Sequence, residues 1–242
     1  MRKSLVTLFL VCIAVSAAAV DLPKQGFGLH VGWSQPILRL NTNTSHDSLA
    51  TVVKMNGVKV GLVYDASYIA GFGSSMGLNY TFGLSNGGWK SRYPQYGDYP
   101  KTRQLITYHQ LEVFIDWQYK FEIAKETYLM LYTGPTVQCG LELSMRVDTK
   151  KENPNTGEIE TIYGVGHSGY SKDAEPDQQF KRVNVTWGVG AGFQYKRYFL
   201  RGGYDFGLLV PYKNVDFENG NHTRGRMDQW NIRIGMYLWY ED

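Results

Sequence analysis

Strict two-residue alternation of apolar and polar side chains is the feature that most constrains this chain of 242 residues. It is clearest from Gln110 to Phe121, where every odd position is apolar and nearly every even position is polar or charged. Successive side chains of a β-strand point to opposite faces, so this pattern predicts a strand with one apolar and one polar face. Helical periodicity is almost absent after residue 20. The sequence therefore predicts an all-β protein.

The alternation recurs in eight segments, most of which reach the roughly 9–11 residues of a tilted membrane strand. They lie at 27–34, 58–68, 72–82, 110–121, 129–146, 182–195, 198–208 and 229–240. Their connections alternate between short ones (69–71, 124–126, 196–197) and long ones (39–56, 84–104, 148–180, 211–227). This organisation predicts an eight-stranded antiparallel up-and-down transmembrane β-barrel with four long outer loops and three short periplasmic turns.

The first residues have the composition of a cleavable export signal. Arg2 and Lys3 precede an apolar run, and alanines at 17–19 form a small-residue cleavage site. We expect residues 1–19 to be a signal peptide and residues 20–242 to be the barrel domain. Removal of the two basic residues lowers the formal net charge from +3 to +1, which argues against a nucleic-acid partner. Cys139 is then the only mature thiol, so no disulfide or cysteine metal site is expected.

Alternation alone does not tell which face points inward, and a soluble lipocalin-like barrel would show the same stripes reversed. The polar stripe is rich in Gly, Ser, Thr and Asn and carries nearly balanced charges, which suits the narrow, side-chain-filled interior of a small barrel. We expect these charged residues to form a structural network in the lumen: Lys59, Asp65, Glu112, Asp116, Lys120, Glu142, Arg146, Arg182, Arg201, Asp205 and Arg233. The near balance of charge favours a salt-bridged plug over a passive, porin-like pore.

The last strand carries a more specific motif, with Arg233, Gly235, Leu238 and Tyr240 spaced along it. In this motif and in its architecture, the chain resembles the small Gram-negative outer-membrane β-barrel family that includes outer-membrane proteins A and X. The resemblance implies a location in the cell outer membrane and insertion by the barrel-assembly machinery, which reads this C-terminal signal. Glu241 and Asp242 follow the last aromatic residue, where many members end on the aromatic itself.

The long connections hold the remaining candidate residues. Aromatic residues of 84–104 lie among basic ones and are candidate loop contacts: Trp89, Tyr93, Tyr96 and Tyr99. Exposed aromatic residues beside arginines are good binding anchors, although attraction between this basic loop and the acidic loop 148–180, or to lipopolysaccharide phosphates, explains them equally well. The sequence Asn153 to Gly157 is typical of a hairpin turn, so we expect the strand before it to return as a ribbon.

The residues favour a non-enzymatic function. We expect a membrane anchor that presents surface loops to outer-membrane lipid, lipopolysaccharide, a ligand or an unidentified protein partner of an outer-membrane complex. The alternative is a lipid-modifying hydrolase or acyltransferase that uses His46, His167 or His222, but their surroundings show no specific catalytic pattern. We expect no catalytic, cofactor-binding or metal-binding residue, and no cofactor.

Overall fold

The computed structural model describes residues 25–43, 48–69, 71–91, 100–153, 156–170, 180–211 and 223–241. These residues form twelve strands in one sheet. The strands are β1 (Gln25–Asn43), β2 (Ser48–Lys54), β3 (Asn56–Ile69), β4 (Phe72–Asn86), β5 (Lys90–Ser91), β6 (Lys101–Ala124), β7 (Thr127–Glu152), β8 (Ile159–Ile162), β9 (His167–Ser168), β10 (Val183–Tyr195), β11 (Tyr198–Gly207) and β12 (Thr223–Glu241). The described part of the chain contains no helix that could span a membrane.

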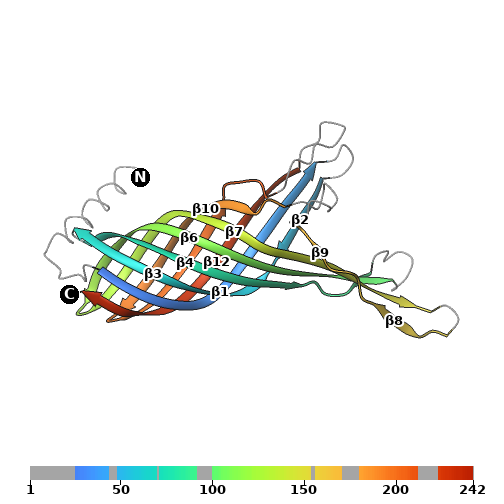
Figure 1. Ribbon diagram of the computed structural model, residues 1–242, viewed down its shortest axis with the longest axis horizontal. Helices are drawn as coiled ribbons and strands as arrows, with labels where there is room; N and C mark the ends of the chain where they lie inside the picture. The colour runs from blue at the N-terminus through green and yellow to red at the C-terminus, as the bar shows by residue number, and fades with distance from the viewer. Residues whose placement is uncertain are drawn as a thin grey trace, which may run out of the picture.

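Antiparallel pairing closes the sheet into a ring. The ring runs β1–β3–β4–β6–β7–β10–β11–β12, and β12 pairs with β1 along nearly its whole length. Only β2, β5, β8 and β9 of the described strands lie outside this path, each beside a longer strand. Figure 1 shows the resulting barrel, with the start of β1 and the end of β12 at the same end. The predicted ring of antiparallel strands is confirmed.

The two faces of the ring have opposite chemistry. Val113, Ile115 and Trp117 are 43–51% exposed on the outside, whereas Glu112 and Asp116 between them are at most 4% exposed. The same holds around the barrel, where exposed apolar side chains alternate with buried ones that are mostly polar, together with a small apolar cluster of Val63, Phe114, Met130, Phe199 and Tyr237. A water-soluble barrel would bury its apolar face instead. The predicted orientation is confirmed, and the lipocalin-like alternative is excluded.

Tight turns close one end of the barrel. They join β3 to β4, β6 to β7 and β10 to β11, at the end where β1 begins and β12 ends. Gly71, Glu126 and Lys196 have φ of 85°, 57° and 53° in these turns. Glycine adopts this left-handed region without a steric cost, whereas Glu126 and Lys196 pay a strain of about 1–2 kcal/mol each.

The longest connections differ from the sequence-based expectation because much of their length is strand. β1 and β12 continue together past the barrel to Asn43 and Thr223, and β2 folds back on β1. We call this extension, residues 36–43, 48–54 and 223–229, the β1–β12 arm. β6 and β7 likewise continue to Lys101 and Glu152, and β5, β8 and β9 flank them. We call residues 89–91, 100–109, 142–153 and 156–168 of this extension the β6–β7 arm, and the two arms diverge in Figure 1.

The predicted ribbon after the barrel part of β7 is confirmed. β7 pairs with β8 from Thr149↔Ile162 to Glu152↔Ile159, and Gly157 N–H donates to the Asn153 carbonyl in the turn between them. Gly157 has a φ of 68°, a left-handed conformation that glycine adopts without a steric cost.

A β-bulge inverts the faces of β7 near the outer mouth. His109 pairs with Glu142 and Gln110 pairs with Gly140, so Leu141 has no partner of its own on β6. A bulge adds one residue to a strand, and one residue is enough to exchange its two faces. Leu143 is therefore buried and Glu142 exposed, the reverse of what uninterrupted alternation predicts.

Candidate functional site: a filled lumen and two outer arms

The half of the lumen nearer the arms contains an ion pair surrounded by neutral donors. Lys59 Nζ lies 2.6 Å from Glu112 Oε2, and both side chains are almost completely buried. The remaining acceptor capacity of this carboxylate is used by four further donors, at 2.6–3.3 Å: Asn79, Thr81, Gln110 and Gln229. A buried charge is tolerated only when it is paired and hydrogen-bonded, and Glu112 meets both conditions.

The half of the lumen nearer the tight turns contains a second network, centred on Asp65. Arg201 Nη2 and Lys120 Nζ lie 2.7 and 3.2 Å from Asp65 Oδ2. Tyr237 donates its hydroxyl to the same oxygen, and Arg201 also donates to Ser75 at 2.7 Å. The residues of this network come from β3, β4, β6, β11 and β12. Its hydrogen bonds therefore connect strands that are not neighbours in the ring.

A looser group lies between the two networks. Arg233, Asp116 and Asp205 line a cavity of about 10 Å³, and Asn231 donates to Asp205 at 3.1 Å. The Arg233 guanidinium lies 5.3 Å from the centre of the Phe114 ring. A cavity of this size holds about one water molecule, and most of the side chains that line it are buried.

Three residues expected in the lumen lie elsewhere. Glu142 is exposed because of the bulge at Leu141. Arg182 is exposed at the mouth, where it donates to the carbonyls of Gly140 and Leu141. Arg146 lies on the β6–β7 arm, beyond the same bulge, and bonds Asp148.

The other eight residues do line the lumen, and their charges balance. Four are basic (Lys59, Lys120, Arg201, Arg233) and four acidic (Asp65, Glu112, Asp116, Asp205); seven are buried and Asp205 is half-buried. Equal numbers of opposite charges suit mutual pairing, whereas a pore that selects ions by charge is lined by one sign.

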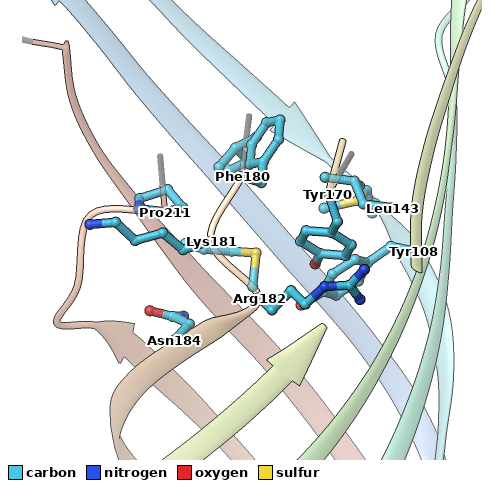
Figure 2. A pocket seen from close by; sticks show the side chains of 11 residues that line it. Tyr108, Leu143, Tyr170, Phe180, Lys181, Arg182, Asn184 and Pro211 are labelled. Atoms are coloured by element: carbon cyan, nitrogen blue, oxygen red, sulfur yellow. The ribbon is translucent and has the colours of Figure 1, made fainter. Parts of the chain in front are cut away.

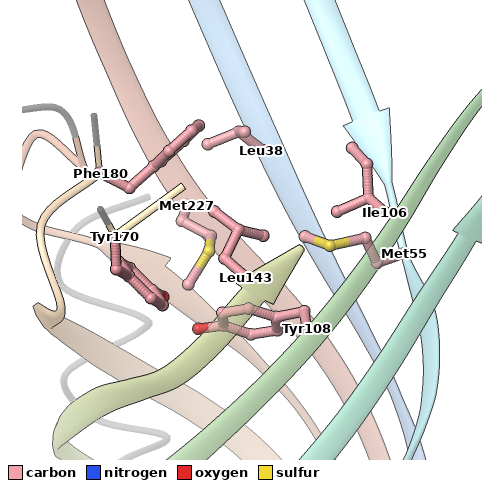
Figure 3. Close-up of a cluster of buried hydrophobic side chains, with 8 residues drawn as sticks. All are labelled: Leu38, Met55, Ile106, Tyr108, Leu143, Tyr170, Phe180 and Met227. Carbon is pink, nitrogen blue, oxygen red and sulfur yellow. The ribbon is translucent and has the colours of Figure 1, made fainter. Parts of the chain in front are cut away.

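An apolar cluster covers the outer mouth of the lumen. Figure 3 shows its side chains converging from both arms and from the segment before β10. The cluster consists of Leu38, Met55, Ile106, Tyr108, Leu143, Tyr170, Phe180 and Met227. Beside it lies a cavity of about 30 Å³, with Arg182 and Lys181 among its lining residues (Figure 2). That volume holds one or two water molecules.

Each arm carries a buried aspartate held by two arginines, an arrangement that sequence reasoning missed. On the β6–β7 arm, Arg103 and Arg146 each approach Asp148 to 3.0 Å, and the Gly164 backbone N–H donates to it at 3.3 Å. On the β1–β12 arm, Arg39 and Arg226 each approach Asp228 to 3.0 Å. In each group one arginine, Arg103 or Arg39, lies on the strand paired with that of the aspartate. The other, Arg146 or Arg226, lies two residues before the aspartate on the same strand. The cross-strand pairs can be identified only from the register between the strands.

Of the predicted loop aromatics, Trp89 lies in the described part of the chain. Its ring is flanked by the Arg103 guanidinium and the Lys150 ammonium, each 4.7 Å from the ring centroid. These contacts attach Trp89 to the β6–β7 arm through cation–π interactions. Tyr93, Tyr96 and Tyr99 lie outside the described residues.

The predicted insertion signal lies on the part of β12 that closes the ring. Arg233 points into the lumen and Leu238 outward, at 5% and 50% exposure. A Cβ on Gly235 would come 2.2 Å from the Phe199 ring and 2.5 Å from the Leu29 carbonyl, so this position requires glycine. The side chain of Tyr240 is outside the described set.

The histidines are dispersed in the described structure. His30 lies in the lumen beside Asn79, and His109 bonds Tyr80 on the outside of the barrel. His167 is exposed on β9, whereas His46 and His222 are outside the described residues. Among the residues that the structure describes, no group of three His, Cys, Asp or Glu side chains is close enough to hold a metal ion.

Comparison with known proteins gives likeness in structure only. No family model and no curated protein matches the sequence. Among solved structures, the attachment invasion locus protein Ail of Yersinia pestis is 11% identical with a TM-score of 0.40, over 90% of this chain and 100% of that chain. Neisserial surface protein A is 10% identical with a TM-score of 0.38, over 87% and 97%. The N-terminal β-barrel domain of Pseudomonas aeruginosa OprF is 10% identical with a TM-score of 0.24, over 85% and 97%.

All three are outer-membrane β-barrel proteins, the group and the location that the sequence resemblance named. The geometry of this chain defines its own class: a closed antiparallel ring, apolar outside and polar inside, is a membrane-spanning β-barrel.

Proposed function

We propose that the protein is a non-enzymatic outer-membrane barrel that anchors its two arms at the cell surface for contact with lipid, lipopolysaccharide or a partner protein. In this proposal it is an eight-stranded up-and-down barrel with three short periplasmic turns and four long outer connections. The signal peptide, residues 1–19, is removed on export, and the barrel-assembly machinery inserts the barrel through the last strand.

One observation supports the anchoring function: the outside of the ring is apolar, whereas its inside is mostly polar and contains a balanced set of charges. Lipid can therefore surround the apolar outer face. Because the ring has no open edge, the backbone N–H and C=O groups of its strands are hydrogen-bonded between strands and need no water. The charged interior is stable only as a paired network, which gives it a structural role.

The position of the arms supports contact at the surface. Both extend from the end of the barrel opposite the tight turns, and both carry paired charges; the β6–β7 arm also carries aromatic residues such as Trp89 and Tyr163. A rigid barrel that displays polar extensions on one side is suited to binding.

The anchoring function is tested by the behaviour of the mature chain in membranes. We expect it to stay in carbonate-washed outer membranes and to migrate faster on gels when unboiled than when boiled, because the closed barrel resists detergent. Recovery of the chain in the soluble periplasm without detergent would overturn the proposal.

The lack of enzymatic activity is tested separately. Lipid A from cells that produce wild-type protein, the triple variant His46→Ala, His167→Ala, His222→Ala, or neither should have the same mass spectrum. A modification that the wild type makes and the triple variant does not would support the hydrolase or acyltransferase alternative.

A further inference from the structure

Phe82, Tyr204 and Trp230 lie on the outside of the barrel near the arms, and we call these aromatic residues the outer aromatic belt. The arginine pair of the β1–β12 arm lies directly beside this belt. Tyr204 and Trp230 pack edge to face with their ring centroids 4.6 Å apart, both on the outside of the barrel. The Tyr204 hydroxyl donates to Asp228 Oδ2 at 2.7 Å, and the Gly207 N–H donates to Oδ1 at 3.1 Å. The carboxylate is completely buried by these neighbours. Its position is therefore fixed relative to the aromatic belt.

The two arginines face each other across the strand pair. Arg39 and Arg226 are register partners on β1 and β12, an arrangement in which like charges repel. Each points its Nε at the same Asp228 oxygen, at 3.0 Å, and about half of each side chain stays exposed. Two positive charges share one negative charge, so the group keeps an excess of one positive charge on an exposed surface.

The height of this group matches the headgroup layer of a bilayer. A strand rises roughly 3.4 Å per residue and is tilted by about 40° in small barrels, so Asp228, two residues past Trp230, lies about 5 Å above it along the membrane normal. The headgroup layer is about 5–8 Å thick on each side, beginning where interfacial tryptophans lie. The salt bridges hold both guanidinium groups next to Asp228, and hence within this layer.

The matching pair on the other arm lies too high for such contact. Arg103 is six residues from His109, whose ring packs on the belt residue Phe82 with centroids 5.0 Å apart. The same rise and tilt place Arg103 about 15 Å above the belt, beyond the headgroups. One of the Arg–Asp–Arg groups is therefore at lipid level and the other is not.

From this geometry we infer that Arg39 and Arg226 form a binding site for a phosphate group of an outer-leaflet lipid. The inference rests on the proposed function, since it requires the barrel to span the membrane. Guanidinium groups bind phosphate oxygens in a bidentate manner, and an adjacent pair of them suits the anionic phosphomonoesters of lipid A. The phosphate would balance the excess charge that Asp228 leaves.

The test measures binding of fluorescent diphosphoryl lipid A to folded protein in zwitterionic micelles by anisotropy. We expect the double variant Arg39→Gln, Arg226→Gln to bind at least about tenfold more weakly than the wild type. The matched variant Arg103→Gln, Arg146→Gln removes the same two charges beside one aspartate at the higher position, and it should bind like the wild type. Dephosphorylated lipid A should compete poorly against the labelled lipid.

Three results would overturn the site: equal competition by dephosphorylated lipid A, equal weakening in the matched variant, or unchanged binding in the first variant. Competition by inorganic phosphate as effective as by lipid A would assign the pair to free phosphate and overturn the lipid assignment. The unboiled gel shift of each variant shows that the barrel is folded. A folded, membrane-inserted barrel without phosphate-dependent binding contradicts this inference alone, whereas a chain that never enters the membrane contradicts the proposed function.

Discussion

Glu112 is held in the lumen by one cation and four neutral donors, all contributed by other positions of the barrel wall. Glu112→Gln keeps the shape of this side chain but leaves Lys59 buried without its ion-pair partner. We expect the free energy of unfolding to fall by roughly 3–5 kcal/mol. Urea-induced unfolding in lipid vesicles, followed by loss of the fast-migrating band, measures it.

Two further variants make this result specific. Adding Lys59→Met to Glu112→Gln removes the uncompensated charge, so the double variant should be more stable than Glu112→Gln alone. Glu142→Gln removes an exposed carboxylate and should change stability by no more than about 0.5 kcal/mol. Equal losses for Glu112→Gln and Glu142→Gln would contradict the assignment of Glu112 to the lumen network.

Asp148 gives the β6–β7 arm a defined response to acid. Burial alone would raise the pKa of this carboxyl, but hydrogen bonds from Arg103 and the Gly164 N–H, together with the Arg146 charge, lower it below its usual value. A depressed folded-state pKa adds stability above the unfolded pKa of about 3.9, and this stability is lost as pH falls through the folded value. We therefore expect the arm to loosen only below about pH 4.

The ring of Trp89 reports on this change, because Arg103 contacts both Trp89 and Asp148. The ¹⁹F resonance of 5-fluorotryptophan at this position, assigned with Trp89→Phe, should stay constant from pH 7 to 5 and shift below pH 4. Asp148→Asn should show the shifted resonance already at pH 7. A transition between pH 5 and 7 would be evidence against control by Asp148.

At the scale of one strand, the bulge at Leu141 decides which side chains of β7 face water. In a Cys139→Ser background, Glu142→Cys should react quickly with a membrane-impermeant maleimide, whereas Leu143→Cys should react slowly because it lies in the apolar cluster. Labelling of unboiled protein, compared with boiled protein as the fully reactive reference, measures both rates.

The opposite order of reactivity would mean that β7 alternates without interruption. Ser144→Cys serves as a further position beyond the bulge: it lies on the same face as Glu142, is half-buried, and should react at an intermediate rate. The three rates together distinguish an inverted face from a general loosening of the strand.

For the whole molecule, the filled lumen predicts an electrically silent barrel. The cavity between the lumen networks is about 10 Å³ and the one at the mouth about 30 Å³, so each holds only one or two water molecules. We expect protein incorporated into planar bilayers to produce no stepwise conductance. Steps that scale with the amount of heat-modifiable protein would favour the pore alternative.

The sequence by itself determined the ring of antiparallel strands, the outward apolar face and the ribbon after Glu152. All three depend on local rules: a period of two residues, and turn residues such as Gly157. Those rules act between neighbours in the chain, so they can be read without knowing which strands pair.

The tertiary structure alone decided which charges meet. Arg201 bonds Asp65 across 136 residues, and Gln229 bonds Glu112 across 117. It also decided the face of Glu142, because the bulge is set by pairing with β6 and leaves no mark in the alternation. The Arg–Asp–Arg groups and the apolar cover of the lumen arise in the same way, from register and from arms that extend past the barrel. A contact between distant segments depends on the register with which the strands meet around the ring, which no local pattern contains.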